Sequence, residues 1–247
     1  MTFGSLFAGI GGFDLGFERA GLTCRWQVEI DPYCQRVLAK HWPNVARWDD
    51  VRTFAVDRFV ERVDVICGGF PCQDISLAGK GAGIDGERSG LWSEYARIVR
   101  TLRPRYVVVE NVAALLGRGL GRVLGDLADS GFDAEWSVLS ACALGASHSR
   151  ERLFLVAYAT GESWHVVQNL ISEKSDCEYR LPLESGRGGG SINSRRWVYE
   201  PSVRRVVDDV PDRVERLRGL GNAVVPQVAE WIGRRLMEAE HGCRLPG

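Results

Sequence analysis

One cysteine stands where a buried strand gives way to a loop. The apolar run 63–67 is followed by two glycines and then by the tetrapeptide FPCQ at 70–73, which contains Cys72. In open α/β sheets ligands bind beyond the carboxyl ends of the strands, so this thiol would face a substrate. A lone cysteine is more often a buried structural residue, but Pro71 stiffens the backbone before it and the glycine-rich stretch 79–86 is typical of a mobile lid.

A carboxylate and two arginines stand at the ends of other apolar runs. Glu110 follows the run 107–109, and if that strand neighbours the one before Cys72, the acid and the thiol flank one substrate. Burial would raise the pKa of this acid, so that it could donate a proton near neutral pH. In isolation a loop-fixing or helix-capping role is the more common one. Arg150 and Arg152 precede a strand rather than follow it, so an ordinary charged loop stays an alternative for them.

A glycine-rich loop, 7–13, lies between the first predicted strand and the first predicted helix. Glycines let the backbone approach a ligand closely, and a helix N-terminus offers free amides. Glu29 ends the second strand, where a ribose hydroxyl is bound in dinucleotide-type folds. The spacing differs from GxGxxG because the third glycine arrives at once, at Gly12. The pattern predicts a nucleoside-type cofactor, with a purely structural tight turn as the alternative.

Composition limits the class of protein. The chain has 247 residues, 45% of them hydrophobic and 26% charged, which suffices for one well-buried domain and a small appendage. No run approaches the roughly 18 apolar residues of a membrane span, and no secretion signal is evident, so we expect a cytoplasmic protein. Seven cysteines without a CxxC pair argue against disulfides and a zinc ribbon, and we expect reduced thiols and no metal.

The net charge of −1 gives no overall attraction to nucleic acid. All but three of the 31 basic residues are nevertheless arginine, and many of them lie between 187 and 218. Arginine suits forked contacts with phosphate and guanine, so a local binding face is possible. On charge alone, a solvated arginine-rich surface is the simpler interpretation.

Strand and helix patterns alternate up to about residue 159. This rhythm predicts a parallel sheet with helices on both faces. The expected helix 32–41 is opened by Asp31 as its cap and by Pro32 at its first position. The other expected helices are 13–20, 91–102 and 118–130, and the expected strands are 2–7, 23–28, 63–67, 105–109, 136–140 and 153–157.

The rhythm breaks in the polar, glycine-containing segment 161–212, and a helical apolar stripe returns at 226–240. We therefore expect a catalytic and cofactor-binding domain over 1–159, a small inserted segment over 160–213, and a C-terminal segment over 214–247 that docks back on the first domain. A structureless loop of that length would be uncommon, so the insert is a small domain or a functional excursion.

Together these motifs resemble the DNA cytosine-5 methyltransferase family. The matching stretches, in family order, are Phe7–Gly12, Gly69–Gln73, Glu110–Val112, Arg150–Arg152 and Gly221–Pro226. The resemblance implies an α/β, Rossmann-like S-adenosylmethionine-dependent methyltransferase sheet with helices on both faces and a small inserted recognition domain. It also implies a methyl transfer to cytosine in double-stranded DNA, by a protein that we expect to be monomeric.

The resemblance assigns roles residue by residue. Cys72 would add to C6 of a flipped-out cytosine, Glu110 would hold the base at N3 and its amine, and Arg150 and Arg152 would hold its carbonyl or nearby backbone. The implied contacts to S-adenosylmethionine are Phe7, Gly9, Ile10, Gly11, Glu29, Ile30, Asp50, Val51, Leu91, Asn222 and Ala223. The implied contacts to DNA are Gln73, Ser76, Arg88, Arg195 and Arg196.

Three features depart from the family pattern. His148 and Ser149 precede Arg150 where the family commonly has glutamine, the Arg-x-Leu-Thr pattern is missing, and the insert is short. The short insert predicts a recognition that relies on few contacts. The alternatives are a cytosine-5 methyltransferase acting on RNA, a nicotinamide-dependent oxidoreductase and a catalytically silent DNA-binding module. The early third glycine opposes the oxidoreductase, and an intact thiol, acid and glycine loop oppose the silent module.

Overall fold

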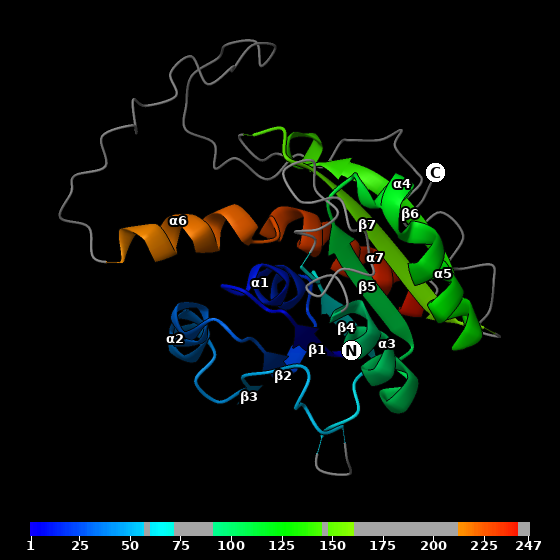
Figure 1. The fold of residues 1–247 in the computed structure, drawn as a ribbon, viewed down its shortest axis with the longest axis horizontal. Coiled ribbons are helices and arrows are strands. Elements are labelled where there is room, and N and C mark those ends of the chain that lie inside the picture. Colours follow the sequence, from blue (N-terminus) through cyan, green and yellow to red (C-terminus); the bar gives the residue numbers. More distant parts are fainter. Residues whose placement is uncertain (57–59, 72–90, 145–147, 161–211, 242–247) are drawn as a thin grey trace.

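The computed structural model describes residues 1–56, 60–71, 91–144, 148–160 and 212–241. Its centre is one seven-stranded sheet with the order β3-β2-β1-β4-β5-β7-β6 (Figure 1). The strands are β1 (Thr2–Leu6), β2 (Thr23–Val28), β3 (Ala46–Trp48), β4 (Val65–Gly68), β5 (Tyr106–Asn111), β6 (Phe132–Ser140) and β7 (Glu151–Ala159). The predicted site residues Cys72, Gln73, Ser76, Arg88, Arg195 and Arg196 lie outside the described residues.

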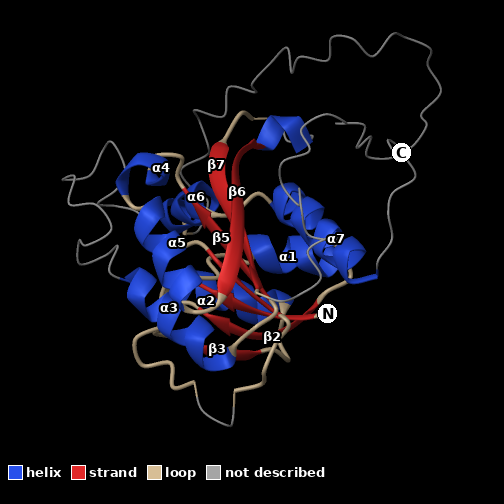
Figure 2. Ribbon diagram, turned by 90° about the vertical axis from the view of Figure 1, so that its right-hand side faces the viewer, coloured by secondary structure: helices blue, strands red, loops and turns tan. Residues whose placement is uncertain are grey.

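Helices cover both faces of the sheet, as Figure 2 shows, with α3, α4 and α5 on one side and α1 and α7 on the other. Each face has its own apolar core, because the nearly continuous Val, Ile and Leu runs of the central strands bury both faces. The helices are α1 (Gly12–Arg19), α2 (Pro32–His41), α3 (Leu91–Leu102), α4 (Leu115–Arg118), α5 (Leu120–Asp129), α6 (Arg213–Asn222) and α7 (Pro226–His241), with a short 3-10 helix at Ala141–Leu144.

Most of the predicted elements are confirmed. The expected helix 32–41 has the predicted bounds, and the Asp31 carboxylate accepts hydrogen bonds from the backbone of Tyr33 and Cys34 at 2.8 and 3.0 Å. The expected helix 118–130 is α5, whereas the short helix α4 before it and the short strand β3 were not predicted. Three residues are too few to give a periodic pattern in the sequence.

The prediction of an all-parallel sheet is wrong at one strand. β7 runs antiparallel to both of its neighbours, β5 and β6, whereas β1 to β5 pair in parallel. Hydrophobic runs of similar length form buried strands of either direction, so the sequence pattern does not distinguish them. The reversal places the start of β7 at the carboxyl edge of the parallel strands.

The C-terminal helix α7 packs on α1 through glycines. A Cβ atom at Gly16 would lie 2.5 Å from the Cβ of Ala229, and one at Gly233 would lie 2.8 Å from the Cβ of Ala20. The apolar stripe predicted for 226–240 is buried in this contact, including Ile232. The two ends of the described chain therefore share one core, while the predicted domain boundaries themselves stay predictions.

No helix among the described residues is long and apolar enough to cross a bilayer.

Candidate active site

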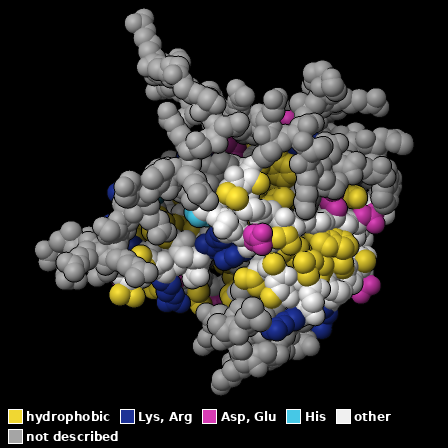
Figure 3. Space-filling model, turned by 90° about the horizontal axis from the view of Figure 1, so that it is seen from above, with side chains coloured by type: hydrophobic (Ala, Val, Ile, Leu, Met, Phe, Trp, Pro, Cys, Tyr) yellow, Lys and Arg dark blue, Asp and Glu magenta, His cyan; other side chains and the backbone are white. Residues whose placement is uncertain are grey.

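A cavity of about 750 Å³ opens at the carboxyl edge of the parallel strands. This volume lies within the range of roughly 300–1,000 Å³ that is usual for small-ligand sites. Figure 3 looks onto the top of Figure 1 and shows acidic and basic side chains close together near the centre of that surface. Of the predicted site residues, the cavity is lined by Phe7, Gly9, Glu29, Ile30, Asp50, Val51, Leu91, Glu110, Arg150, Arg152 and Asn222.

The glycine loop forms one wall of this cavity in a tightly folded conformation. Phe7, Gly9 and Gly11 all have left-handed backbone angles, with φ of 52°, 56° and 88°. Glycine adopts this conformation without steric cost, but Phe7 does not, and such strain is concentrated at ligand sites. The backbone N–H of Ala8 donates to the carbonyl of Val28 at 3.1 Å, which fixes the loop to β2.

Glu29 is buried beside the glycine loop, and its carboxylate accepts hydrogen bonds from the backbone. One oxygen accepts from the N–H of Gly9 and the other from the N–H of Asp31, each at 2.7 Å. Burial raises the pKa of Glu29, and these backbone hydrogen bonds oppose that rise. Each carboxylate oxygen has a second lone pair, so the side chain can still accept from two hydroxyl groups. This arrangement fits a ribose diol.

The wall at the end of β3 combines an acid with apolar side chains. The Asp50 carboxylate accepts from the guanidinium of Arg52 at 2.7–3.1 Å and from the N–H of the same residue at 2.9 Å. These hydrogen bonds lower the pKa of Asp50. Val51 and Leu91 also line the cavity, as does Ile30, which is 60% exposed. A planar aromatic ring would find apolar contacts here and an acceptor at its edge.

Glu110 lies at the other end of the cavity, at the carboxyl end of β5. It is 8% exposed, and one of its oxygens lies 3.1 Å from Nε of Arg152. Burial raises the pKa of Glu110 to about 7, although Arg152 and Arg150 act in the opposite direction. Near neutral pH the carboxyl group therefore exists in both protonation states and can donate or accept a proton.

The loop that leads to Cys72 is held against Glu110. A Cβ atom at Gly69 would lie 2.6 Å from Oε2 of Glu110, so a side chain at this position would displace the carboxyl group. The side-chain amide of Asn111 donates to the carbonyl of Phe70 at 3.2 Å. Pro71, the last described residue before Cys72, lines the cavity. Asn111 belongs to a predicted motif, but its role as a support for this loop was not predicted.

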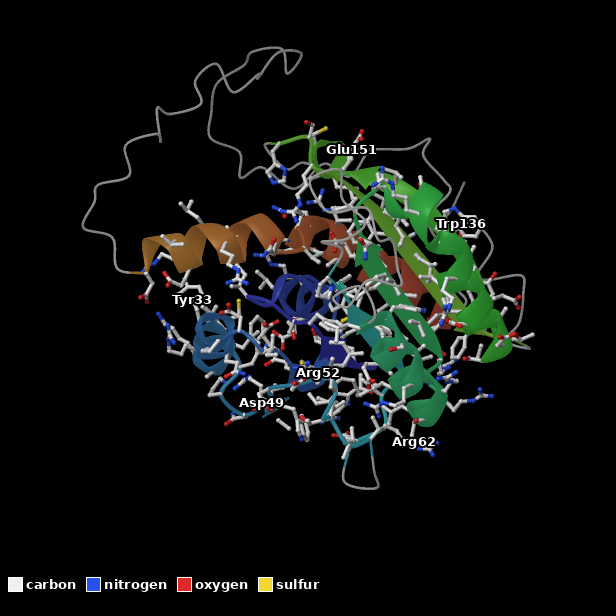
Figure 4. The ribbon with its side chains drawn as sticks, viewed as in Figure 1. Tyr33, Asp49, Arg52, Arg62, Trp136 and Glu151 are labelled. Carbon is white, nitrogen blue, oxygen red and sulfur yellow. The ribbon has the colours of Figure 1, made fainter. Side chains whose placement is uncertain are left out.

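The antiparallel direction of β7 explains how the two arginines reach the cavity. β7 begins at Glu151, which lies between the two arginines in the sequence. In Figure 4, Glu151 lies far from Asp49 and Arg52, which follow β3 in the chain. Arg150 donates from Nη1 to the carbonyl of Gly221 at 2.7 Å, while its buried Nε–H has no hydrogen-bond partner among the described residues. Burial lowers the pKa of Arg150. The guanidinium has five N–H donors, so Arg150 keeps donors for a ligand.

Helix α6 contributes a polar face that the sequence analysis missed. Glu215, Arg218, Gly219 and Asn222 line the cavity, and only Asn222 was predicted. Their spacing of three and four residues marks one helical face, but no helix was predicted for these residues. A Cβ at Gly219 would lie 3.0 Å from Ile10, which explains the close approach of α6 to the glycine loop.

Three predicted cofactor residues do not line the cavity. Gly11 is the N-cap of α1 and faces the ring of Trp42, and Ala223 is the C-cap of α6. Ile10 lies beneath Gly219. Their roles in ligand binding stay predictions. The described residues include no group of three or more His, Cys, Asp and Glu side chains that could hold a metal ion.

Known proteins with similar sequences are bacterial methyltransferases. M.Eco47II of Escherichia coli is 39% identical over 62% of this chain and 38% of its own length. M.NgoFVII of Neisseria gonorrhoeae is 32% identical over 84% of this chain and 59% of its own, and both are named type II methyltransferases. The chain spans about half the length of the curated relatives it matches.

The fold is shared with solved methyltransferases. A putative DNA modification methyltransferase of an E. coli prophage aligns with a TM-score of 0.55 and 24% identity, over 64% of this chain and 47% of its own. Dnmt2 of S. pombe aligns with a TM-score of 0.55 and 19% identity, over 66% of this chain and 52% of its own. These likenesses confirm the Rossmann-like methyltransferase sheet. The family model for C-5 cytosine-specific DNA methylases matches residues 1–211, and the chain therefore belongs to that family.

Proposed function

We propose that this chain transfers a methyl group from S-adenosylmethionine to C5 of a cytosine in double-stranded DNA. The observation that carries the proposal is one continuous cavity with two different ends. The glycine loop and Glu29 line one end, while Glu110, Arg150 and the residues directly before Cys72 line the other. Such a cavity can hold a nucleoside donor and a target base side by side.

The donor end fits S-adenosylmethionine in its chemistry. Glu29 has acceptor capacity for the ribose hydroxyls, Val51 and Leu91 offer apolar contacts for the adenine, and Asn222 lines the same cavity. Several acids line this end, which suits a ligand that carries a positive charge. When bound, the donor supplies an electrophilic methyl group.

The target end would supply the nucleophile and the proton chemistry. In the proposed reaction the thiolate of Cys72 adds to C6 of the cytosine, and the electron pair moves to C5, which takes the methyl group. Glu110 holds N3 and the exocyclic amine, and its pKa of about 7 lets it share a proton with the ring. Loss of the C5 proton then expels the thiolate from C6 and restores the aromatic ring.

The target base must leave the duplex to reach such a cavity. Base flipping costs a few kcal/mol, and we propose that Gln73 and Ser76 offset part of this cost by filling the vacated space. Arg88, Arg195 and Arg196 are proposed to contact the DNA, and selectivity is proposed to lie in residues 161–212. The family model and the type II names of the relatives favour DNA over RNA as the substrate.

The test combines a methylation assay with one substitution. The protein should methylate cytosine in a duplex of mixed sequence, detected by bisulfite sequencing, and Cys72→Ala should abolish the product while S-adenosylmethionine still binds. Methylation of RNA in place of DNA would overturn the substrate assignment. Undiminished activity of Cys72→Ala would overturn the assignment of the nucleophile.

A further inference from the structure

A carboxylate with no role in the proposed reaction is completely buried under the glycine loop. Asp14 lies in the first turn of α1, is 0% exposed and does not line the cavity. It accepts from the side chains of Gln27 at 2.8 Å, Ser5 at 3.1 Å and Cys24 at 3.5 Å. Burying a carboxylate is costly unless donors surround it, and here three donors and the N-terminus of a helix do so.

The network continues to a cation at the surface. The amide of Gln27 donates to Asp14 and accepts from Nε of Arg47 at 3.0 Å. This orientation turns the positive end of the amide dipole toward the carboxylate. Arg47 is fixed in turn, because it donates to the carbonyl of Trp42 at 2.9 Å. Asp14 and Arg47 are thus connected through the side-chain amide of Gln27.

The network connects the elements that carry the two parts of the donor site, the glycine loop and Glu29. Ser5 lies on β1 just before the glycine loop, and Asp14 lies on α1 just after it. Gln27 stands two residues before Glu29 on β2. The loop and Glu29 meet directly in the hydrogen bond from Gly9. A shift of α1 against β2 would therefore change the separation between the loop amides and the carboxylate of Glu29.

Burial raises the pKa of Asp14, and the hydrogen bonds from Gln27 and Ser5 oppose that rise. Stability alone does not account for a carboxyl group buried at this position. Buried ionic groups can often be replaced by apolar side chains of similar size without loss of stability, so their presence points to a role in fixing one geometry. We propose that Asp14 is a positioning residue of the donor site, and that it holds the glycine loop and Glu29 at the separation that the ribose requires. This inference rests on the proposed function.

The experiment measures binding of S-adenosylmethionine by calorimetry without DNA, and then kcat with donor and DNA at saturation. Asp14→Ala should raise the dissociation constant at least tenfold and change kcat less than threefold. Asp14→Asn, which keeps one acceptor oxygen and the shape, should recover most of the affinity. Gln27→Met, which breaks the link to Arg47, should fall between these two variants, and it serves if Asp14→Ala does not fold.

The matched control is Asp126→Ala on α5. Asp126 also accepts from two side chains, from the buried Trp92 at 2.8 Å and from the exposed Arg122 at 3.1 Å, but it lies on the opposite face of the sheet from α1. It should lower the melting temperature and leave donor affinity unchanged. Equal loss of affinity in Asp126→Ala, or native affinity in the folded Asp14 and Gln27 variants, would overturn the inference. A wild-type protein that binds no donor would instead refute the proposed function.

Discussion

The two ends of the cavity hold their buried acids in different ways. Glu29 and Glu110 are both 8% exposed, and burial raises the pKa of both. Glu29 accepts from two backbone N–H groups, whereas Glu110 contacts the guanidinium of Arg152. Backbone donors are fixed by the fold, but a long side chain can move and exchange partners.

This difference matches the tasks proposed for the two ends. A donor site must present one geometry to a ligand that is bound and released without change to the protein, so a rigid acceptor suits it. The target end must accommodate a change of protonation and the arrival of a base. A carboxyl group with a pKa of about 7 and a side-chain partner allows both. Substitutions at the two ends should therefore have separable effects.

The largest effect is expected from Glu110→Ala. The change removes the acid that lies beside Gly69, and loss of a general acid–base group typically costs about 10²- to 10⁴-fold in rate. We expect kcat to fall by this amount while the dissociation constant of S-adenosylmethionine stays within threefold. Loss of donor binding in this variant would show that the two ends are not separate.

Glu29→Gln should weaken the binding of S-adenosylmethionine and leave kcat nearly unchanged, the reverse of Glu110→Ala. The amide keeps one acceptor oxygen but replaces the other with a donor that faces the N–H of Gly9 or Asp31. Hydrogen bonds to a charged group contribute about 1.5–3 kcal/mol, so donor affinity should fall roughly 10- to 100-fold. Calorimetry measures the affinity, and a kcat at saturating donor below one third of the native value would contradict the comparison.

Gly69→Ala tests the target end without removing an acid. The new methyl group would meet Oε2 of Glu110 at 2.6 Å and displace the end of a flexible side chain rather than backbone. Stability should change little, while misplacement of the carboxyl group should lower kcat roughly 10- to 100-fold. The control is Gly117→Ala on α4, where nothing lies within 4 Å of the added atom. Equal activity of both variants would refute the role of Gly69.

The smallest expected effect is a shift in the pH dependence of the methylation rate. If the protonated form of Glu110 is active, the rate should be highest below its pKa of about 7 and decline as pH rises through that value. Arg152 lowers this pKa, so Arg152→Gln should move the decline to higher pH. Rate profiles from pH 6 to 9 at saturating donor measure the shift, corrected for any change in maximal rate. A shift to lower pH would contradict the assigned direction.

Local features of the site could be predicted because local residues decide them. The cap at Asp31, the bounds of α2 and α3, the strand before the FPCQ motif and the burial of Glu110 all follow from residue type and short-range pattern. The motifs also sufficed to indicate the family that the family model supports. Hydrophobic runs and capping residues act within a few positions, so they are visible in the sequence.

Only the tertiary structure decided which distant residues share the cavity. The reversal of β7 brings Arg152 to Glu110, and neither the direction of a buried strand nor its neighbours can be read from its side chains. The polar face of α6 became part of the site because Gly219 lets that helix approach Ile10. In the sequence, Asp14 is an acid in the first turn of a predicted helix, and only the fold shows that Ser5, Cys24 and Gln27 surround it. Contacts between residues far apart in the chain depend on the packing of whole elements, and packing is a property of the complete fold.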